Sequence, residues 1–516
     1  MIKNTCLSLA LLLSASTSLA ADMPISENEI DEIAERALET FETPGMSVGI
    51  LKDGELIFAK GYGIADVETG AKITPDTVFG IASHTKAYTV GALAMLKDQG
   101  KLDWDDKVID HIPEFRLYDP YATREFTIRD LLTHRSGLDL GAGDLLMFPN
   151  STASRADIIN ALQHLKPVSS FRSKYDYDNL LYIVAGEVVT RVSGQPWEEY
   201  IEEHIFKPLN MTSCRSMRER LPSDAPSAAP HIPVDGKITK TYWQSGEPMT
   251  AAGSINCSLN DHAKWIALQL NEGKMKDGTA LYSEDRHKEI WSPVTMMRGS
   301  AIKRGEFDEH FSAYGLGWIL SDAGGELRVR HTGGLVGMVT YTNLLPEQEM
   351  AVMVFTNSMN GGPMVSVSHE ILDAYLGLDN GDWITAFKEY QQEARKRAEE
   401  VMAKAAPKSS GGTPSQPTDN YVGTYHDAWY GDIEVRLNGD NLEIAFGRSE
   451  LLTGPLEYFQ NNTFIARWYD RTLEADAYVT FETSPEGNIN GIKMKPVSPL
   501  TDFSFDFQHL DPKRVQ

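Results

Sequence analysis

The stretch Phe79–Gly100, FGIASHTKAYTVGALAMLKDQG, places a polar tetrad, Ser-His-Thr-Lys, at the start of a nearly apolar run. From Tyr88 to Leu96 apolar residues occupy almost every side of a helix, which predicts that this helix is buried. Ser83 and Lys86 lie three residues apart and therefore share one helix face. Because an unpaired lysine is costly to bury, the two groups either meet water at the helix tip or face each other.

A buried helix of this kind would aim Ser83 and Lys86 into a cleft. There the helix dipole and desolvation both favour a neutral amine. A neutral lysine can accept the serine proton, which turns the hydroxyl into a nucleophile. The structural alternative is that Ser83 caps the helix and Lys86 is a solvated residue of its first turn. A second Ser-x-x-Lys, Ser300–Lys303, lies in a basic, glycine-flanked stretch with no apolar helix after it, so we expect a surface loop there.

Two later segments also place polar residues beside predicted elements. KYDYDNLLYIVAGEVV puts Tyr177 and Asn179 just before an apolar helix. Taken alone, this pattern favours a structural role in which Asn179 caps the helix. RVRHTGGLVGM puts the run His331–Gly334 at the end of a predicted strand, where it could also form an ordinary turn.

Together and in this order, the motifs SHTK, YDN and HTG resemble those of the penicillin-recognising serine hydrolases. That family comprises class C β-lactamases, D-alanyl-D-alanine carboxypeptidases, D-aminopeptidases and related esterases. Two more segments are similar to family segments, TIRDLLTHRSGL at 127–138 and AAGSINCSLNDHAKW at 251–265. The resemblance covers residues 25–377. It implies hydrolysis through an acyl-enzyme that requires no metal or cofactor.

The resemblance also implies a role for each matching residue. Ser83 would be the acylated nucleophile, with Lys86 as its immediate proton partner. Tyr177 would act as a general base, its phenolate favoured by the nearby lysine, and would protonate the leaving group. The substrate would be contacted by Asn179, His331, Thr332 and Gly333, and Asn179 would also orient Lys86. The backbone N–H groups of Ser83 and Gly334 would form the oxyanion hole.

Two positions decide how far the resemblance extends. His331 stands where class C β-lactamases have lysine, and in the family histidine there is more typical of peptidases and esterases. Because histidine is mostly neutral at pH 7, it should recognise an anionic substrate weakly, which argues against strong β-lactamase activity. Asp178 adds a negative charge between Tyr177 and Asn179, and we expect its side chain to point away from the site.

The sequence therefore predicts a serine hydrolase that cleaves amide bonds of small peptides with D-amino acids, or β-lactams. An esterase acting on short acyl esters is one alternative, and a penicillin-binding-like protein that is acylated without turnover is another. An α/β-hydrolase is disfavoured, because the one Gly-x-Ser-x-Gly match, Gly45–Gly49, leads into a strand instead of a helix. No H-E-x-x-H motif points to a zinc hydrolase.

The chain divides by its residue patterns into two structured regions. A hairpin at 49–67, a helical middle and strand-like runs between Glu326 and Asn357 predict an α+β, β-lactamase/transpeptidase-like domain whose antiparallel sheet collects both ends of the domain. We expect this domain over 21–380, followed by a charged helix and flexible linker over 381–419. Short alternating runs over 420–516 predict an all-β barrel or sandwich, similar to the lipocalin-like appendages of some of these hydrolases.

Residues 1–20 have the features of a secretory signal peptide, with a lysine at position 3, an apolar run and Ser-Leu-Ala at the end. We therefore expect a periplasmic or secreted protein. The 48 basic and 73 acidic residues give a net charge of −25, which argues against nucleic acid and anionic membranes as partners. No later segment is apolar enough to span a membrane. The expected partner is a small molecule or short peptide, and a homo-oligomer is left open.

The chain has three cysteines, of which Cys6 falls in the predicted signal peptide. The other two, Cys214 and Cys257, could form a disulfide in an oxidising compartment. Two separate buried thiols are the alternative. The sequence leaves both open, because it does not show whether the two Cα atoms come close enough to be bridged.

Overall fold

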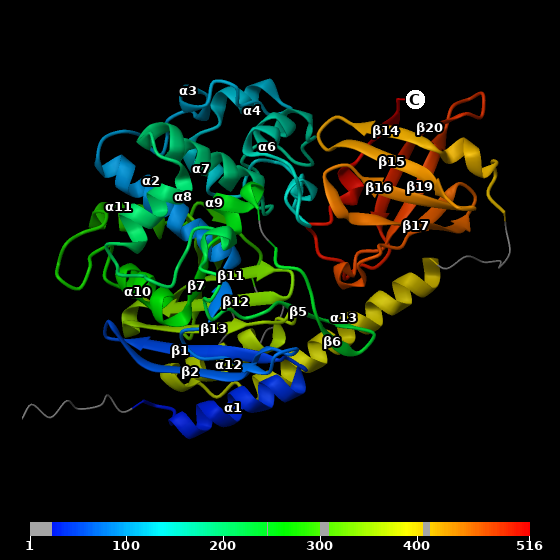
Figure 1. Ribbon diagram of the computed structural model, residues 1–516. Coiled ribbons are helices and arrows are strands. Elements are labelled where there is room, and N and C mark those ends of the chain that lie inside the picture. The colour runs from blue at the N-terminus through cyan, green and yellow to red at the C-terminus, as the bar shows by residue number, and fades with distance from the viewer. Residues whose placement is uncertain (1–22, 245, 300–308, 406–412, 516) are drawn as a thin grey trace, which may run out of the picture.

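The computed structural model describes residues 23–244, 246–299, 309–405 and 413–515. The predicted signal peptide, the second Ser-x-x-Lys motif and the first part of the predicted linker lie outside the described residues. The chain forms an α+β main domain and an all-β C-terminal domain, which confirms the predicted fold class (Figure 1).

An antiparallel sheet forms the centre of the main domain. Within the described residues it has nine strands in the order β3-β2-β1-β13-β12-β11-β10-β9-β8. β1 pairs with β13, so the predicted N-terminal hairpin and the late strands do meet in one sheet. The strands are β1 (Gly45–Lys52), β2 (Glu55–Asp66), β3 (Ala71–Lys72), β8 (Thr295–Met296), β9 (Ser312–Tyr314), β10 (Ile319–Ala323), β11 (Glu326–Leu335), β12 (Met338–Leu345) and β13 (Met350–Thr356).

The sheet is covered on both faces, and the sequence of one of its inner strands, β13, shows this. Along β13, Val352 and Val354 pack with the helices on one face, whereas Met353 and Phe355 belong to the core on the other. This is the period of two that a strand imposes on its side chains. Figure 1 shows α1, α12 and α13 on one side of the sheet and the helical region on the other.

The helical region is built around α2, the helix that follows Ser83. Eleven of its fourteen residues are buried, as the apolar run predicts. Of the helices in the described residues, none is both long and apolar enough to cross a membrane. The helices are α1 (Glu27–Thr40), α2 (Thr85–Asp98), α3 (Val108–His111), α4 (Pro120–Glu125), α5 (Ile128–Leu131), α6 (Arg155–Ala161), α7 (Leu180–Ser193), α8 (Trp197–Ile201), α9 (Thr250–Gly253), α10 (Leu259–Leu270), α11 (Glu284–Ile290), α12 (Gly362–Leu376) and α13 (Trp383–Ala405).

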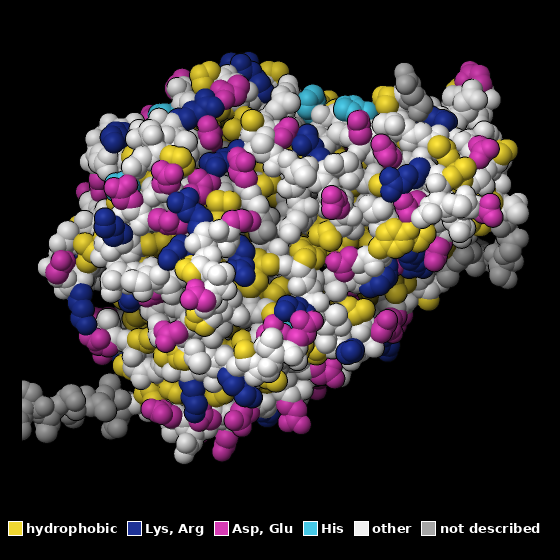
Figure 2. Space-filling view, in the orientation of Figure 1, with side chains coloured by type: hydrophobic (Ala, Val, Ile, Leu, Met, Phe, Trp, Pro, Cys, Tyr) yellow, Lys and Arg dark blue, Asp and Glu magenta, His cyan; other side chains and the backbone are white. Residues whose placement is uncertain are grey.

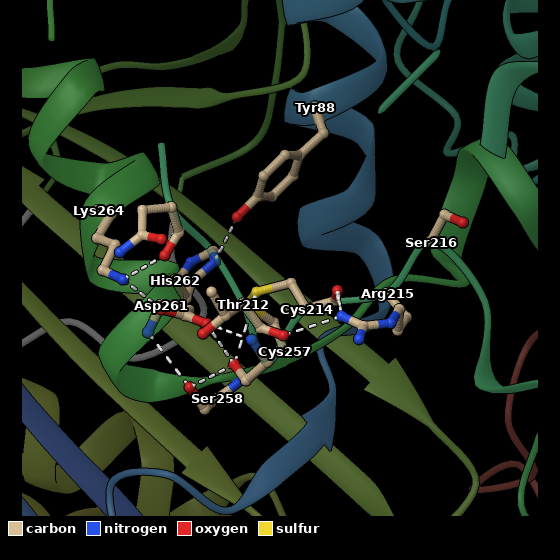
Figure 3. The surroundings of a disulfide bond; sticks show 12 residues. Tyr88, Thr212, Cys214, Arg215, Ser216, Cys257, Ser258, Asp261, His262 and Lys264 are labelled. Atoms are coloured by element: carbon tan, nitrogen blue, oxygen red, sulfur yellow. Dashed lines mark hydrogen bonds and ion pairs between the residues drawn. A yellow bond between two sulfur atoms is a disulfide. The ribbon is translucent and has the colours of Figure 1, made fainter. Parts of the chain in front are cut away.

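A short two-stranded sheet anchors the start of α2. β4 (Val78–Gly80) pairs with β7 (Asn256–Ser258), and Phe79 lies opposite Cys257. Cys257 forms a disulfide with Cys214, so of the two alternatives the structure has the bridge. Figure 3 shows this disulfide beside Ser258 and Asp261. The bridge therefore ties a distant loop to the strand pair that leads directly into Ser83. A second small sheet consists of β5 (His231–Val234) and β6 (Lys237–Lys240).

The C-terminal domain is a closed barrel, so of barrel and sandwich the structure has the barrel. Its interior is filled by aromatic side chains, including Tyr421, Phe464 and Phe481, whose rings contact one another. A filled interior makes this barrel a packed core. Its likeness to lipocalins stays a prediction. Within the described residues the strands are β14 (Gly423–Asp427), β15 (Gly431–Asn438), β16 (Asn441–Phe446), β17 (Ser449–Gln460), β18 (Thr463–Ala466), β19 (Ala477–Thr483), β20 (Ile489–Pro496) and β21 (Lys513–Arg514).

The barrel packs against the main domain on the side of the helical region (Figure 1). Arg448 of the barrel forms an ion pair with Asp157 at 3.3 Å, and its carbonyl oxygen accepts a hydrogen bond from the Thr152 N–H at 2.8 Å. On the face shown in Figure 2, acidic and basic side chains are interspersed over both domains.

Candidate active site

Ser83 lies in a tight turn between β4 and α2. The residue before it, Ala82, has a φ of 50°, a left-handed conformation that is unfavourable for a residue with a Cβ atom. The turn is held in place from the side, because the Ile81 N–H donates to the Ile255 carbonyl oxygen at 2.9 Å. α2 begins at Thr85 and has no side-chain cap, so the alternative in which Ser83 is a helix cap is wrong.

Lys86 is fully buried, and its ammonium group points at three oxygen atoms. Nζ lies 3.1 Å from Ser83 Oγ, 2.8 Å from Asn179 Oδ1 and 2.9 Å from the Ala252 carbonyl oxygen. Burial lowers the pKa of Lys86 to about 7, and the charge of Asp144 partly opposes this shift. A large fraction of the amine is therefore neutral near pH 7. Because Lys86 is fully buried, the alternative in which it is a solvated first-turn residue is wrong.

Tyr177 approaches Ser83 from the other side. Its hydroxyl donates to Ser83 Oγ at 2.8 Å, and Lys86 Nζ lies 4.7 Å from the centre of its ring. Burial raises the pKa of Tyr177 well above its usual value of 10. This direction favours the protonated phenol, and the phenolate expected at Tyr177 stays a prediction. Of the two groups that contact Ser83 Oγ, Lys86 has the lowered pKa, which makes its amine the stronger candidate to take the serine proton.

Asn179 connects Lys86 to a residue that the sequence did not point to. It occupies the N-cap position of α7, but its side chain makes no capping hydrogen bond, so the purely structural capping alternative is wrong. Its Oδ1 accepts from Lys86, and its Nδ2 donates to Asp144 Oδ2 at 2.9 Å. Asp144 is fully buried, and burial, together with the nearby Asp506, raises the pKa of its carboxyl group well above the usual value. In sequence it was one aspartate in a glycine-rich segment, a pattern that is common in turns.

Asp178 points away from the site, as expected. Its Oδ2 accepts from the Ser136 hydroxyl at 2.6 Å, and its backbone N–H donates to His134 Nδ1 at 3.0 Å. Burial raises the pKa of Asp178 to about 8. The carboxyl group that the sequence placed beside the candidate site is thus turned inward, away from Ser83.

His331 and Thr332 lie on β11 at the rim of the site. Nδ1 of His331 is 2.7 Å from the Thr332 carbonyl oxygen, which only accepts, so this nitrogen carries the proton. Nε2 then accepts from the Tyr314 hydroxyl at 2.9 Å. Burial lowers the pKa of His331 to about 3, which keeps the ring neutral. The exposed Thr332 side chain is therefore better placed than His331 to meet a substrate.

Gly333 and Gly334 differ in what surrounds them. A Cβ atom on Gly333 would lie 2.3 Å from the Ile81 carbonyl oxygen and 2.4 Å from Thr340 Oγ1. β11 therefore approaches the Ser83 turn so closely that only glycine fits there. A Cβ atom on Gly334 would meet nothing within 4 Å. The open side of Gly334 belongs to the same cavity as Ser83.

The predicted site residues line one cavity of about 370 Å³. Ser83, Tyr177, Asn179, His331, Thr332, Gly333 and Gly334 all contribute to its wall, and Lys86 lies just behind Ser83. Much of the remaining wall is apolar, with contributions from Met147, Phe148, Met249, Leu335, Met359 and Met364. Of the described residues that line the cavity, none is a lysine or arginine. Asp502, Phe503 and Ser504 of the C-terminal domain also line it.

A metal site is not visible in the described part of the chain, where no group of three or more His, Cys, Asp or Glu side chains is arranged to hold an ion. The polar atoms around Ser83 are instead an amine, a phenol and an amide, joined by hydrogen bonds. This arrangement can activate a hydroxyl and return a proton to a leaving group.

Family models match both parts of the chain. The Beta-lactamase model matches residues 30–376, and the model of a domain of unknown function, DUF3471, matches residues 407–514. The first match contains every candidate site residue named above from the main domain. The second contains the barrel, including the segment that reaches the cavity.

Known proteins are similar over most of the chain. It is 27% identical over 503 residues to an unguisins hydrolase of Aspergillus campestris, covering 91% of this chain and 90% of that protein. Over 342 residues it is 29% identical to Protein flp of Staphylococcus aureus (strain N315), and it spans 63% of that protein. The fold matches that of an octameric penicillin-binding protein homologue from Pyrococcus abyssi with a TM-score of 0.61 at 22% identity, covering 95% of this chain and all of that one.

Proposed function

The chain belongs to the Beta-lactamase family, and from that premise we propose that it is a serine hydrolase working through an acyl-enzyme on Ser83. The observation that carries the proposal is the position of Ser83 Oγ between two proton-transfer groups. Lys86 Nζ lies 3.1 Å away on one side and the Tyr177 hydroxyl 2.8 Å away on the other. These distances suit proton transfer to and from the same oxygen.

Acylation uses both groups in turn. Neutral Lys86 takes the Ser83 proton as Oγ bonds to the substrate carbonyl carbon. The backbone N–H groups of Ser83 and Gly334 stabilise the oxyanion that develops. Tyr177 then gives its proton to the leaving group as the bond to the carbonyl carbon breaks, and the Lys86 ammonium returns a proton to the phenolate. In the second half, water attacks the acyl carbonyl, and Ser83 leaves with the proton that water lost.

We propose amide bonds of small peptides with D-amino acids as the substrate class. The hydrolase name of the Aspergillus relative supports hydrolysis over the alternative of acylation alone, and the contacts among Ser83, Lys86, Tyr177 and Asn179 support acylation of Ser83. The mostly apolar wall suits an uncharged acyl group. β-Lactams, which carry a carboxylate, should be poor substrates, because His331 is neutral and no described lysine or arginine lines the cavity.

Short acyl esters are the second candidate, and the same mostly apolar wall favours them. The test is a panel of D-amino acid p-nitroanilides, p-nitrophenyl acetate and butyrate, and nitrocefin, given to the wild-type protein and to Ser83→Ala. We expect hydrolysis of an amide or an ester that disappears in Ser83→Ala, with a covalent adduct on Ser83 in the mass spectrum. Adduct formation without turnover would support the penicillin-binding-like alternative, and hydrolysis that persists in Ser83→Ala would overturn the proposal.

We also propose that the protein is exported to the periplasm or secreted. The signal-peptide features of residues 1–20 support this, and so does the Cys214–Cys257 bridge, since disulfides persist in oxidising compartments. Mass spectrometry of the N-terminus of protein recovered from the extracytoplasmic fraction tests it. We further propose that the protein forms a homo-oligomer, and the octameric homologue supports this. Light scattering after size-exclusion chromatography measures the molar mass of the assembly and tests the proposal.

A further inference from the structure

One segment of the C-terminal domain, residues 502–509, reaches across to the candidate active site. It lies between β20 and β21. Asp502, Phe503 and Ser504 line the cavity, and the Phe503 ring centre is 6.2 Å from that of Tyr177. The barrel therefore supplies part of the cavity wall beside Ser83. Polar side chains of the same segment also form hydrogen bonds with the main domain.

Asp506 of this segment holds a turn of the main domain. Its Oδ2 accepts from the Gly143 N–H at 2.7 Å, and its Oδ1 accepts from the Leu145 N–H at 3.0 Å. Asp506 is fully buried, and His509 supports it with Nδ1 at 3.1 Å. A carboxyl group that accepts two backbone N–H groups fixes the chain between them. The residue between them is Asp144.

Asp144 receives hydrogen bonds from both domains on one oxygen. Its Oδ2 accepts from the Ser504 hydroxyl of the barrel at 2.9 Å and from Asn179 Nδ2 at 2.9 Å. An asparagine amide has a donor end and an acceptor end, so a partner for the donor end decides where the acceptor end points. With its NH₂ group on Asp144, Asn179 presents its carbonyl oxygen to Lys86 Nζ at 2.8 Å.

We propose that Asp144, held in place by Ser504 and Asp506 of the C-terminal domain, is a positioning residue that orients Asn179 and through it Lys86. The inference rests on the proposed acyl-enzyme function. On this proposal the barrel contributes to catalysis, because its residues Ser504 and Asp506 hold the aspartate through which Lys86 is oriented. Without the acceptor on Asp144, the Asn179 amide is free to rotate and turn its NH₂ group towards Lys86.

The test compares two changes at Asp144 in the full-length protein. Asp144→Leu keeps the branched shape, with two methyl groups in place of the two oxygens, but removes the acceptor. It should lower kcat by about 100-fold, the cost of a small misplacement in an active site, while KM changes little. Asp144→Asn keeps an acceptor oxygen for Asn179 and should restore most of kcat. When the Asn179 amide turns in Asp144→Leu, the Lys86 ammonium loses the Asn179 carbonyl oxygen as an acceptor, so the pKa of Lys86 should fall and the acidic limb of the rate–pH profile should move to lower pH.

Variants in the barrel extend the test across the domain boundary. Asp506→Ala should lower kcat in the same way. Ser504→Ala is the milder change and should give a smaller loss of kcat, and it carries the test if Asp506→Ala folds poorly. Asp427→Ala is the matched control, because Asp427 is also buried and also accepts backbone N–H groups, from Trp429, Tyr430 and Asp511, but inside the barrel. It should lower the melting temperature without changing kcat or the pH profile of the folded enzyme.

The proposal fails if Asp144→Leu and Ser504→Ala keep the kcat and pH profile of the wild type. A second measurement does not depend on turnover. NMR titration of ¹³C-labelled lysine, with the Lys86 signal assigned by its loss in Lys86→Arg, should show a lower pKa for Lys86 in Asp144→Leu, and an unchanged pKa would also overturn it. Absence of Ser83-dependent hydrolysis in the wild type would instead refute the proposed function, so the two failures can be told apart.

Discussion

The amine of Lys86 lies 3.1 Å from Ser83 Oγ, on a side chain that has no exposure to solvent. Burial of the amine costs free energy, and it also prepares the amine for proton transfer, since desolvation is the main reason why the pKa of Lys86 falls to about 7. Removing the amine should therefore separate activity from stability.

Lys86→Met is expected to lower kcat by about 10²–10⁴-fold, the usual contribution of a general base, while the melting temperature stays equal or rises. The fold should survive because methionine fills similar space without a buried polar group. Thermal melting and turnover of the best substrate measure both effects. Lys97→Met, in the last turn of the same helix and paired with Asp103 at the surface, should keep full activity. Full activity in Lys86→Met would refute its role as the base.

The rate should depend on pH through Lys86. Because its pKa is lowered to about 7 and the neutral amine is the reactive form, kcat/KM should rise as pH increases through 7 and then level off. Burial raises the pKa of Tyr177 well above 10, so no loss of its proton should reduce the rate between pH 8 and 9.5. The profile is measured with an uncharged ester. A rate that falls between pH 6 and 8 would contradict this assignment.

Tyr177→Phe should distinguish good from poor leaving groups. The phenol proton is needed most when the leaving group is a basic amine, so hydrolysis of an alkyl amide should fall by about 10²–10⁴-fold. p-Nitrophenolate leaves without protonation, so the p-nitrophenyl ester should lose much less. The ratio of the two rates in the variant and the wild type is the measurement. An equal loss on both substrates would assign Tyr177 to proton removal from Ser83.

The sequence predicted the parts of the site that depend on local spacing. The i,i+3 spacing predicted that Ser83 and Lys86 would meet, and they do, although Ser83 lies in the turn before α2 and not in the helix itself. The apolar run after them predicted a buried helix. Motif order then indicated that Tyr177, Asn179 and His331 would join them, and the structure brings all of these residues to one cavity.

What the sequence could not predict depends on burial and on distant contacts. The phenolate expected at Tyr177 stays a prediction, and the burial that raises the pKa of its hydroxyl could not be read from neighbouring residues. Asp144 and Ser504 meet across 360 positions of sequence, between two domains, and neither lies in a motif. Predicting the Cys214–Cys257 disulfide requires the distance between the two Cα atoms, which only the folded structure gives.

Gly333→Ala should damage the site through a clash. The new Cβ atom would lie 2.3 Å from the Ile81 carbonyl oxygen, a backbone atom that cannot move without shifting the Ser83 turn. We expect a lower melting temperature and a large loss of kcat. Gly334→Ala has open space at the same strand and should leave the melting temperature unchanged, so it serves as the control for stability. Equal melting temperatures for both variants would show that Gly333 of β11 is not in close contact with the turn before Ser83.

Removing the Cys214–Cys257 bridge should destabilise the region that carries Ser83. The bridge closes a loop with a sequence separation of 43, and closing a loop of this size stabilises a fold by about 2–4 kcal/mol in the chain-entropy model. Cys257 lies opposite Phe79, four residues before Ser83, so loosening the β4–β7 pair should lower activity at temperatures below the global melting point. The double variant Cys214→Ala/Cys257→Ala is compared with the wild type by melting and by turnover against temperature. Peptide mapping without reductant should recover the two cysteines in one linked peptide pair, and free thiols at both positions in the oxidised protein would show that the bridge does not form.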